Sequence, residues 1–159
     1  MAGFGTTLFA ATAAGREGVL TAASGVSDPQ LIAFHILRLL AIGTIVKYLQ
    51  RQLPLHFVIF GSLPDVLFAG SAAVMTVLAA TAPASRELLF AWHSLGFAVF
   101  FGAGISMFLS VPSPLRLFNS RPDASLVFRF PMVLAPNFTV PLFMLAHLFA
   151  IAKIVAVRL

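Results

Sequence analysis

The sequence of 159 residues contains no cysteine and has few charged residues. The absence of cysteine excludes disulfides, thiolate metal sites and thiol catalysis. Charged residues make up 9% of the chain, whereas a soluble globular domain carries about 25%. Because this number of charged side chains is too small to cover a water-facing surface, the composition excludes an ordinary soluble domain.

In place of charge, the chain has long apolar segments. Hydrophobic residues make up 60% of it, and its mean hydropathy is +1.00. The apolar runs are continuous rather than alternating, which favours helices over a barrel, and each crossing of a bilayer needs about 20 apolar residues. We expect residues 1–27 to form a flexible or interfacial leader and residues 28–159 to form one transmembrane domain. The sequence thus predicts an all-α integral membrane protein, an up-down bundle of four transmembrane helices at about residues 29–50, 63–81, 86–109 and 137–157.

Polar caps and prolines set the limits of these helices. A serine, an aspartate and a proline at residues 27–29 are typical of a helix start. Ser62 and Asp65 have the spacing of a capping box at the start of the second helix. The apolar segment 53–60 either lies in the interface or extends this helix upstream of a kink. Ser85 is expected to cap the third helix.

The basic residues flank the apolar segments, which suits contact with lipid phosphates. The net charge of +5 therefore predicts a membrane partner and no nucleic acid. A proline-rich connection at residues 111–136 carries Arg116, Arg121 and Arg129 against the single acid Asp123. We expect it to be a surface for anionic headgroups or for a partner protein. The balance of Lys and Arg slightly favours a cytoplasmic side for this connection and for the one between the first two helices.

Small residues are expected to set how the helices pack, because the hydrophobic effect does not drive association within lipid. Ala98, Gly102 and Ser106 form a small stripe on the third helix, and Ala69 and Ala73 have the same spacing on the second. We therefore expect the second and third helices to pack most closely. A homodimer through the same stripe is the alternative.

Arg38 is the most costly residue to place in a membrane. Counting from residue 28 puts it about 15 Å deep, near the bilayer midplane. A charge there costs about 2.5–3.5 kcal/mol, so Arg38 needs a partner or a wet cavity. His35 lies on the same helical face. Asp65, which has no basic neighbour in sequence, either caps the second helix or contacts an ion, a proton or a headgroup.

The histidines have a common depth. His35 and His93 each lie about two turns into helices that start on the same side, which places both near 10 Å. That geometry suits a bis-histidine haem b or a two-ligand metal site, with Arg38 facing a propionate. His147 is nearer the midplane and is a possible third polar contact, while satisfied structural histidines are the alternative. Neither a catalytic triad nor a metal-ligand spacing motif is present, so the sequence predicts no catalytic residues and no metal site.

Three segments of the chain carry recognisable motifs: SVPSPLRLF at residues 110–118, RFPMVLAPNFTVPLFMLAHLFAIAK at residues 129–153 and, upstream, LPLHFVIFGSLPDVLFAGSA at residues 53–72. In these segments the chain resembles a family of uncharacterised small bacterial integral membrane proteins. The resemblance covers about two-thirds of the chain, and the fourth-helix motif is its most specific part. The resemblance implies a multi-helix membrane protein without naming a reaction, and its matching positions are Asp65, Arg129, Pro136, Pro141 and His147.

The third helix departs from this pattern. Where the family pattern leads us to expect Trp-Asn and an Asp one turn later, this sequence has Trp92, His93 and Val99. Any polar site shared with the family would therefore differ here, and His93 is particular to this chain.

Three functions follow as hypotheses. The first is a non-enzymatic multi-pass protein of a bacterial inner membrane, a small subunit or oligomer that binds a lipid, a lipophilic ligand or a partner protein. The second is a redox subunit that holds haem b between His35 and His93. The third is a small ion- or proton-coupled transporter whose path passes Arg38, Asp65 and His147.

Overall fold

Four long helices make up most of the structure, a computed structural model that describes residues 15, 17–18, 21–22 and 25–156. Those residues form helices and no strands. The four helices span Asp28–Leu49, Leu55–Thr81, Arg86–Phe108 and Ala135–Ala156, and each is long and apolar enough to cross a membrane. The prediction of an all-α chain with four such helices is confirmed. Most of the predicted leader lies outside the described residues.

The first helix consists of three parts, α3 (Asp28–Phe34), η1 (His35–Ala41) and α4 (Ile42–Leu49). It begins where predicted, and the side chain of Gln30 accepts a hydrogen bond from the backbone N–H of Ser27 over 3.0 Å. The middle part is a 3-10 helix, in which residues three apart eclipse one another. Its two buried residues are His35 and Arg38, which this winding places on one face.

The second helix starts earlier than predicted. It runs without a break through α5 (Leu55–Phe57), the π-helical turn η2 (Val58–Ser62) and α6 (Leu63–Thr81). Pro64 has no N–H to offer the carbonyl four residues before it, which accounts for the widened turn. The capping box is therefore wrong: Ser62 is inside the helix, and its hydroxyl shares a hydrogen bond with that of Thr44. Segment 53–60 extends the helix, one of the two alternatives that the sequence left open.

The third and fourth helices have the predicted limits to within two residues. In α7 (Arg86–Phe108), the hydroxyl of Ser85 accepts a hydrogen bond from the N–H of Leu88 over 3.2 Å, as a helix cap does. The connection that follows contains a short 3-10 helix, η3 (Ala124–Phe128). The last helix joins the π-helical turn η4 (Ala135–Thr139) to α8 (Val140–Ala156).

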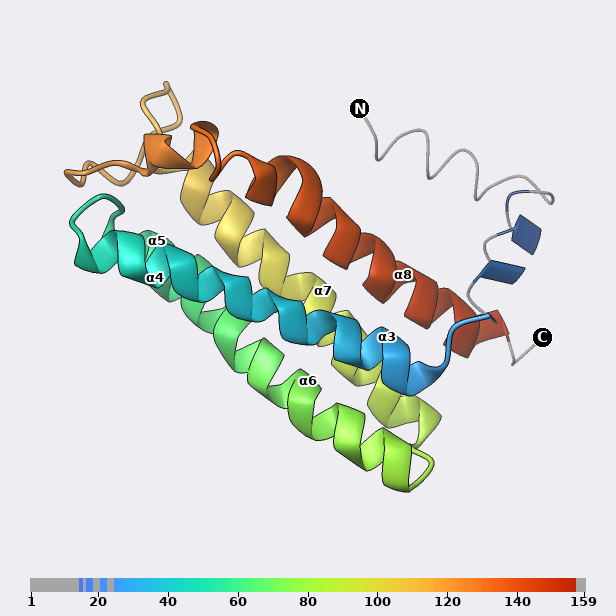
Figure 1. Ribbon diagram of the computed structural model, residues 1–159. Helices are drawn as coiled ribbons and strands as arrows, with labels where there is room; N and C mark the ends of the chain where they lie inside the picture. The colour runs from blue at the N-terminus through green and yellow to red at the C-terminus, as the bar shows by residue number, and fades with distance from the viewer. Residues whose placement is uncertain (1–14, 16, 19–20, 23–24, 157–159) are drawn as a thin grey trace.

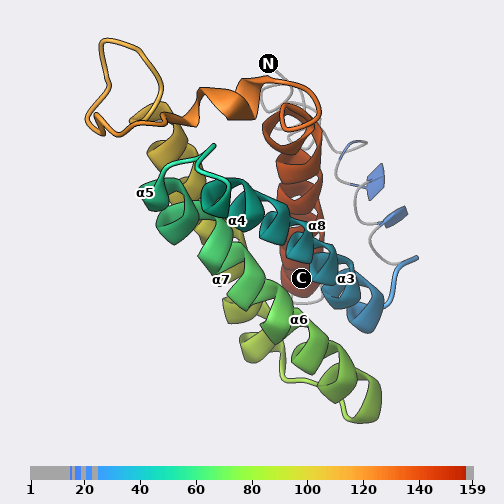
Figure 2. The same cartoon turned by 60° about the vertical axis from the view of Figure 1, so that its left-hand side comes forward.

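The helices pack as an up-down bundle (Figures 1 and 2). The first helix packs against α6 and α8, and α7 packs against α8 and η2. The first and third helices therefore face each other across the bundle interior. In Figure 1 the turn between α4 and α5 and the connection between α7 and α8 lie at one end, with the turn between α6 and α7 at the other.

The predicted close packing of the second and third helices is wrong for most of their length. Ala73 and Ala98 are exposed, and α6 packs along the first helix instead. The two helices do approach closely at one end, where a Cβ added to Gly102 would lie 3.0 Å from the carbonyl oxygen of Phe60. Gly102 is therefore a contact residue, but its partner is η2 and not the Ala69 stripe.

The surface is largely apolar, and the apolar core encloses a group of polar side chains. Large apolar side chains point outward: Leu40 and Leu49 are 70% and 72% exposed, while the guanidinium-bearing Arg38 is 1% exposed. His35 and His147 are also fully buried. An exposed apolar surface is unlike that of a soluble domain and suits a chain surrounded by lipid.

Candidate functional site in the bundle interior

Arg38 is paired with an acid from the second helix. Its Nε donates a hydrogen bond to Oδ1 of Asp65 over 3.0 Å, and its Nη2 forms an ion pair with the same oxygen. Its Nη1 donates to the carbonyl oxygen of Gly96 over 3.1 Å and contacts Nε2 of His147 at 3.3 Å. Arg38 thus has the partner that the sequence required. Asp65 provides it rather than capping a helix.

Two aromatic rings contact the guanidinium in addition to these polar partners. The Cζ atom of Arg38 lies 4.4 Å from the ring centroid of Phe68 and 4.1 Å from that of Phe100. Both distances are within the range of cation–π attraction, which is strongest where water is excluded. Contacts from the other three helices therefore hold Arg38 in one position.

Gly96 makes this close packing possible. A Cβ built at this position would collide with Phe68 and with the imidazole of His147. Its carbonyl oxygen accepts the hydrogen bond from Arg38. Only a residue without a side chain lets α7 approach the centre of the bundle so closely.

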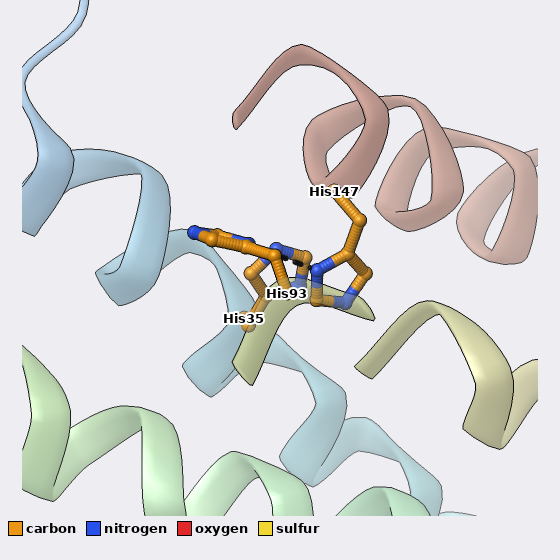
Figure 3. A group of neighbouring side chains, drawn as sticks. All are labelled: His35, His93 and His147. Atoms are coloured by element: carbon orange, nitrogen blue, oxygen red, sulfur yellow. Dashed lines mark hydrogen bonds between the residues drawn. The ribbon is translucent and has the colours of Figure 1, made fainter. Parts of the chain in front are cut away.

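Three buried histidines lie beside Arg38 and come from three different helices (Figure 3). His35 stacks on His147, with ring centroids 3.7 Å apart and planes inclined by 11°. Nδ1 of His93 lies 3.0 Å from Nδ1 of His147. The exposed fraction is 2% for His93 and zero for the other two. The structure thus brings the five sequence candidates His35, Arg38, Asp65, His93 and His147 into one interior site.

The contacts of His147 define where its proton lies. Arginine can only donate, so Nε2 of His147 accepts from Arg38. A neutral imidazole then carries its proton on Nδ1, which donates to Nδ1 of His93. The result is a continuous polar chain from Asp65 through Arg38 and His147 to His93.

His35 has no place in that chain. Among the residues that the structure describes, neither of its ring nitrogens finds a hydrogen-bond partner, although the side chain is completely buried. Buried polar groups are paired in the great majority of cases, and an exception calls for an explanation such as a bound group. His35 is therefore the residue of this site whose polar atoms the described structure leaves unsatisfied.

The three imidazoles could hold a metal ion. One ring nitrogen from each lies within 4.8 Å of the other two. Imidazole is a common ligand for zinc, copper, iron and nickel. The depth count along the helices predicted that His35 and His93 lie at the same level. It placed His147 nearer the midplane, as a possible third polar contact. In the structure His147 stacks directly on His35.

A haem between His35 and His93 meets a steric obstacle in this arrangement. Their ring centroids are 5.9 Å apart, but His147 contacts both rings. A porphyrin placed between them would have to displace His147 from its stack and from Arg38. The haem hypothesis therefore requires that His147 move away, whereas an ion can include His147 among its ligands.

The basic connection between the third and fourth helices lies apart from this site (Figure 1). Arg116 donates to the carbonyl oxygens of Phe118 and Ser120 over 3.1 and 3.0 Å, so it stabilises the loop itself. Arg121 and Arg129 are exposed. Of the three arginines predicted to form one surface, these two are available to a headgroup or a partner.

Hydrogen bonds within the same connection also determine the charge of its single acid, Asp123. The backbone N–H of Ser125 donates to Oδ1 of Asp123 over 2.9 Å. Hydrogen bonds from Ser125 hold the pKa of Asp123 below its usual value, so this carboxylate stays ionised at neutral pH.

Sequence reasoning missed the residues that line the site around the charged groups. Gly96 lies three residues after His93, Phe100 lies seven residues after His93, and Phe68 lies three residues after Asp65. These intervals place them on the same helical face as the polar residue. Extending the helical face from each polar residue would therefore have found them.

Comparisons with known proteins give a family and no activity. A family model described as a domain of unknown function (DUF8737) matches residues 4–155. Searches of curated proteins and of solved structures found no match to this chain.

Proposed function

The chain belongs to the DUF8737 family, and we propose, from its own geometry, that it is a multi-pass protein of the bacterial inner membrane which binds a small ligand inside its helix bundle. It would act there as a small non-enzymatic subunit or oligomer. Four apolar helices and an apolar exterior support the membrane placement. The buried cluster of three histidines beside an ion pair supports an interior site.

The observation that carries this proposal is the state of His35. Burying an unpaired polar group costs about 1–3 kcal/mol, and a leucine of similar size would avoid that cost. Polar residues in apolar surroundings mark function more often than structure, because packing alone does not require them. Arg38 and Asp65 satisfy each other, whereas His35 has both nitrogens free of partners.

A second site is supported by the connection between α7 and α8. The connection that carries the exposed Arg121 and Arg129 also carries outward-facing apolar side chains, of which Phe130 is 81% exposed and Leu117 is 71% exposed. Arginine and aromatic residues side by side suit the region of lipid headgroups. We assign this surface to anionic lipids, with a partner subunit as the alternative.

The transporter hypothesis uses the same interior residues. Asp65, Arg38 and His147 are in direct contact, as a path past them requires. The hypothesis predicts ion- or proton-coupled flux in proteoliposomes, and that flux should disappear in Arg38→Ala.

Native mass spectrometry of the full chain, extracted from native membranes, tests the interior site. We expect a bound non-lipid mass in the wild type that is lost in His35→Leu and retained in His56→Ala, since His56 lies on the second helix and bonds to Ser110 instead. A wild type without such a mass, or a mass that survives in His35→Leu, would overturn the proposal.

A further inference from the structure

We infer that His35, His93 and His147 bind one divalent transition-metal ion through their ring nitrogens. This inference rests on the proposed interior ligand site and names its ligand class. Two observations support it independently: the convergence of the three imidazoles and the unpaired nitrogens of His35. Because the three ligands are 58 and 54 residues apart in sequence, no spacing motif could have predicted the site.

The separation of the nitrogen atoms suits this assignment. In a tetrahedral site with metal–nitrogen bonds of about 2.0–2.1 Å, ligand nitrogens are about 3.3 Å apart. Nδ1 of His93 and Nδ1 of His147 are 3.0 Å apart, and all three ligand atoms lie within 4.8 Å of one another. An imidazole binds a metal in its own ring plane, so the stacked rings of His35 and His147 must turn out of their stack before both can bind one ion. The three side chains already lie together in the bundle interior, so this change is a rotation of rings (Figure 3).

The chemistry of the donors selects the class of metal. Three neutral imidazoles suit zinc, cobalt, nickel or copper, whereas magnesium and calcium prefer oxygen ligands. Arg38 and Asp65 neutralise each other, so the site places no net protein charge against the cation. Three histidine ligands also leave a fourth position open for water or an anion, as in zinc sites that carry out chemistry.

Metal binding must change the contact between Arg38 and His147. Nε2 of His147 accepts from Arg38, so its proton lies on Nδ1, and that nitrogen cannot bind a metal while protonated. Binding through Nδ1 moves the proton to Nε2, and binding through Nε2 occupies the lone pair directly. In both cases the hydrogen bond from Arg38 is lost, so Arg38 and the metal compete for His147.

Arg38 retains its other partners during this exchange. It still pairs with Asp65 and donates to the carbonyl oxygen of Gly96. The N–H group of Arg38 that no longer bonds to His147 would be free to donate to another acceptor. Arg38 is thus a positioning residue, which sets the proton of His147 in the metal-free protein and can donate to an anion on the metal.

The test is a cobalt titration of the full chain, stripped of metal with a chelator and held in a lipid nanodisc. Co²⁺ alone is the probe, because it absorbs visible light strongly when it is tetrahedral. We expect one Co²⁺ per chain with a visible band, displaced by Zn²⁺ and not by Mg²⁺. His35→Leu, His93→Leu and His147→Leu should each weaken binding by at least 100-fold, while His56→Ala should change it by less than threefold.

A second variant tests the competition with Arg38. Arg38→Met combined with Asp65→Leu removes the competitor and its counter-ion together, and should tighten cobalt binding by about fivefold or more, the equivalent of one lost hydrogen bond. This result would not arise if the histidines were structural only.

Other results separate this inference from the proposed function. A wild type without saturable cobalt binding, or equal losses in His35→Leu and His56→Ala, overturns the metal assignment. If the wild type instead carries a haem or an organic molecule in native mass spectra that is absent from His35→Leu, the proposal of an interior ligand site is kept and only the metal assignment is rejected. If neither cobalt nor any native mass depends on His35, both fall.

Discussion

Replacing His35 with leucine should make the metal-free protein more stable. The imidazole is fully buried and neither nitrogen is paired, so each polar atom loses its contact with water and gains nothing in return. An unsatisfied buried group costs about 1–3 kcal/mol, although within membranes hydrogen bonds average about 0.6 kcal/mol because the unfolded chain also finds partners. Leucine fills nearly the same volume without polar atoms.

The gain is offset by lost ring contacts. His35 stacks on His147 at 3.7 Å, and an aromatic pair contributes about 0.5–1.5 kcal/mol beyond its buried area. With two polar atoms relieved at about 1 kcal/mol each and one stack lost, we expect a net stabilisation of about 0.5–1.5 kcal/mol. For a chain of this length, that corresponds to a rise in melting temperature of about 1–6 °C.

The assay is a thermal melt of the chelator-treated chain in detergent, with His147→Leu as the matched control. The control makes the same substitution on a ring that is bonded to Arg38 and His93, so it should lower the melting temperature. A His35→Leu variant that melts below the wild type, by as much as the control does, would refute the argument that His35 is unsatisfied.

Three further changes test the surroundings of the site in the same detergent melts or in lipid-binding measurements. Asp65→Leu leaves Arg38 buried without its counter-ion and should destabilise the fold by about 3–5 kcal/mol. Adding Arg38→Met should restore most of this stability in the double variant, and additive losses would contradict the pairing. Gly96→Ala should lower the free energy of unfolding by about 1–3 kcal/mol through overpacking. In the control Gly70→Ala the added Cβ meets nothing within 4 Å, so this variant should be neutral or stabilising. Equal melting temperatures of the two variants would refute the close approach at Gly96. Arg129→Ala should lower the affinity for phosphatidylglycerol about fivefold in native mass spectra, equivalent to about 1 kcal/mol, and an unchanged lipid count would exclude a headgroup contact.

The helix limits could be predicted where local chemistry decides them. Ser27 and Ser85 precede the first and third helices, and both starts agree with prediction to within one residue. The start of the second helix was predicted eight residues too late, because Ser62 and Pro64 have the pattern of a helix start, while its end at Thr81 agrees with prediction. In the structure the same proline widens a turn inside a longer helix. A local pattern could not distinguish these outcomes, since the apolar residues upstream suit both.

The depth of the site was predictable, but its contacts were not. A fixed rise per residue put His35 and His93 at one level, and their rings do meet. Which face of each helix points inward depends on the rotation of the helices, and helices that are apolar all round carry little information about that rotation. The pairing of Arg38 with Asp65, 27 residues apart, therefore became visible only in three dimensions.

The winding of the first helix connects the two halves of the site. In an α-helix, residues three apart are offset around the axis by about 60°, whereas in a 3-10 helix they eclipse. The 3-10 segment that begins at His35 therefore directs both His35 and Arg38 into the bundle interior. Arg38 is fixed from all sides by Asp65, Gly96 and two aromatic rings, so it holds the turn in place. The satisfied ion pair thus keeps an unsatisfied imidazole buried, and its bonding energy offsets the cost of leaving the nitrogens of His35 unpaired among the described residues.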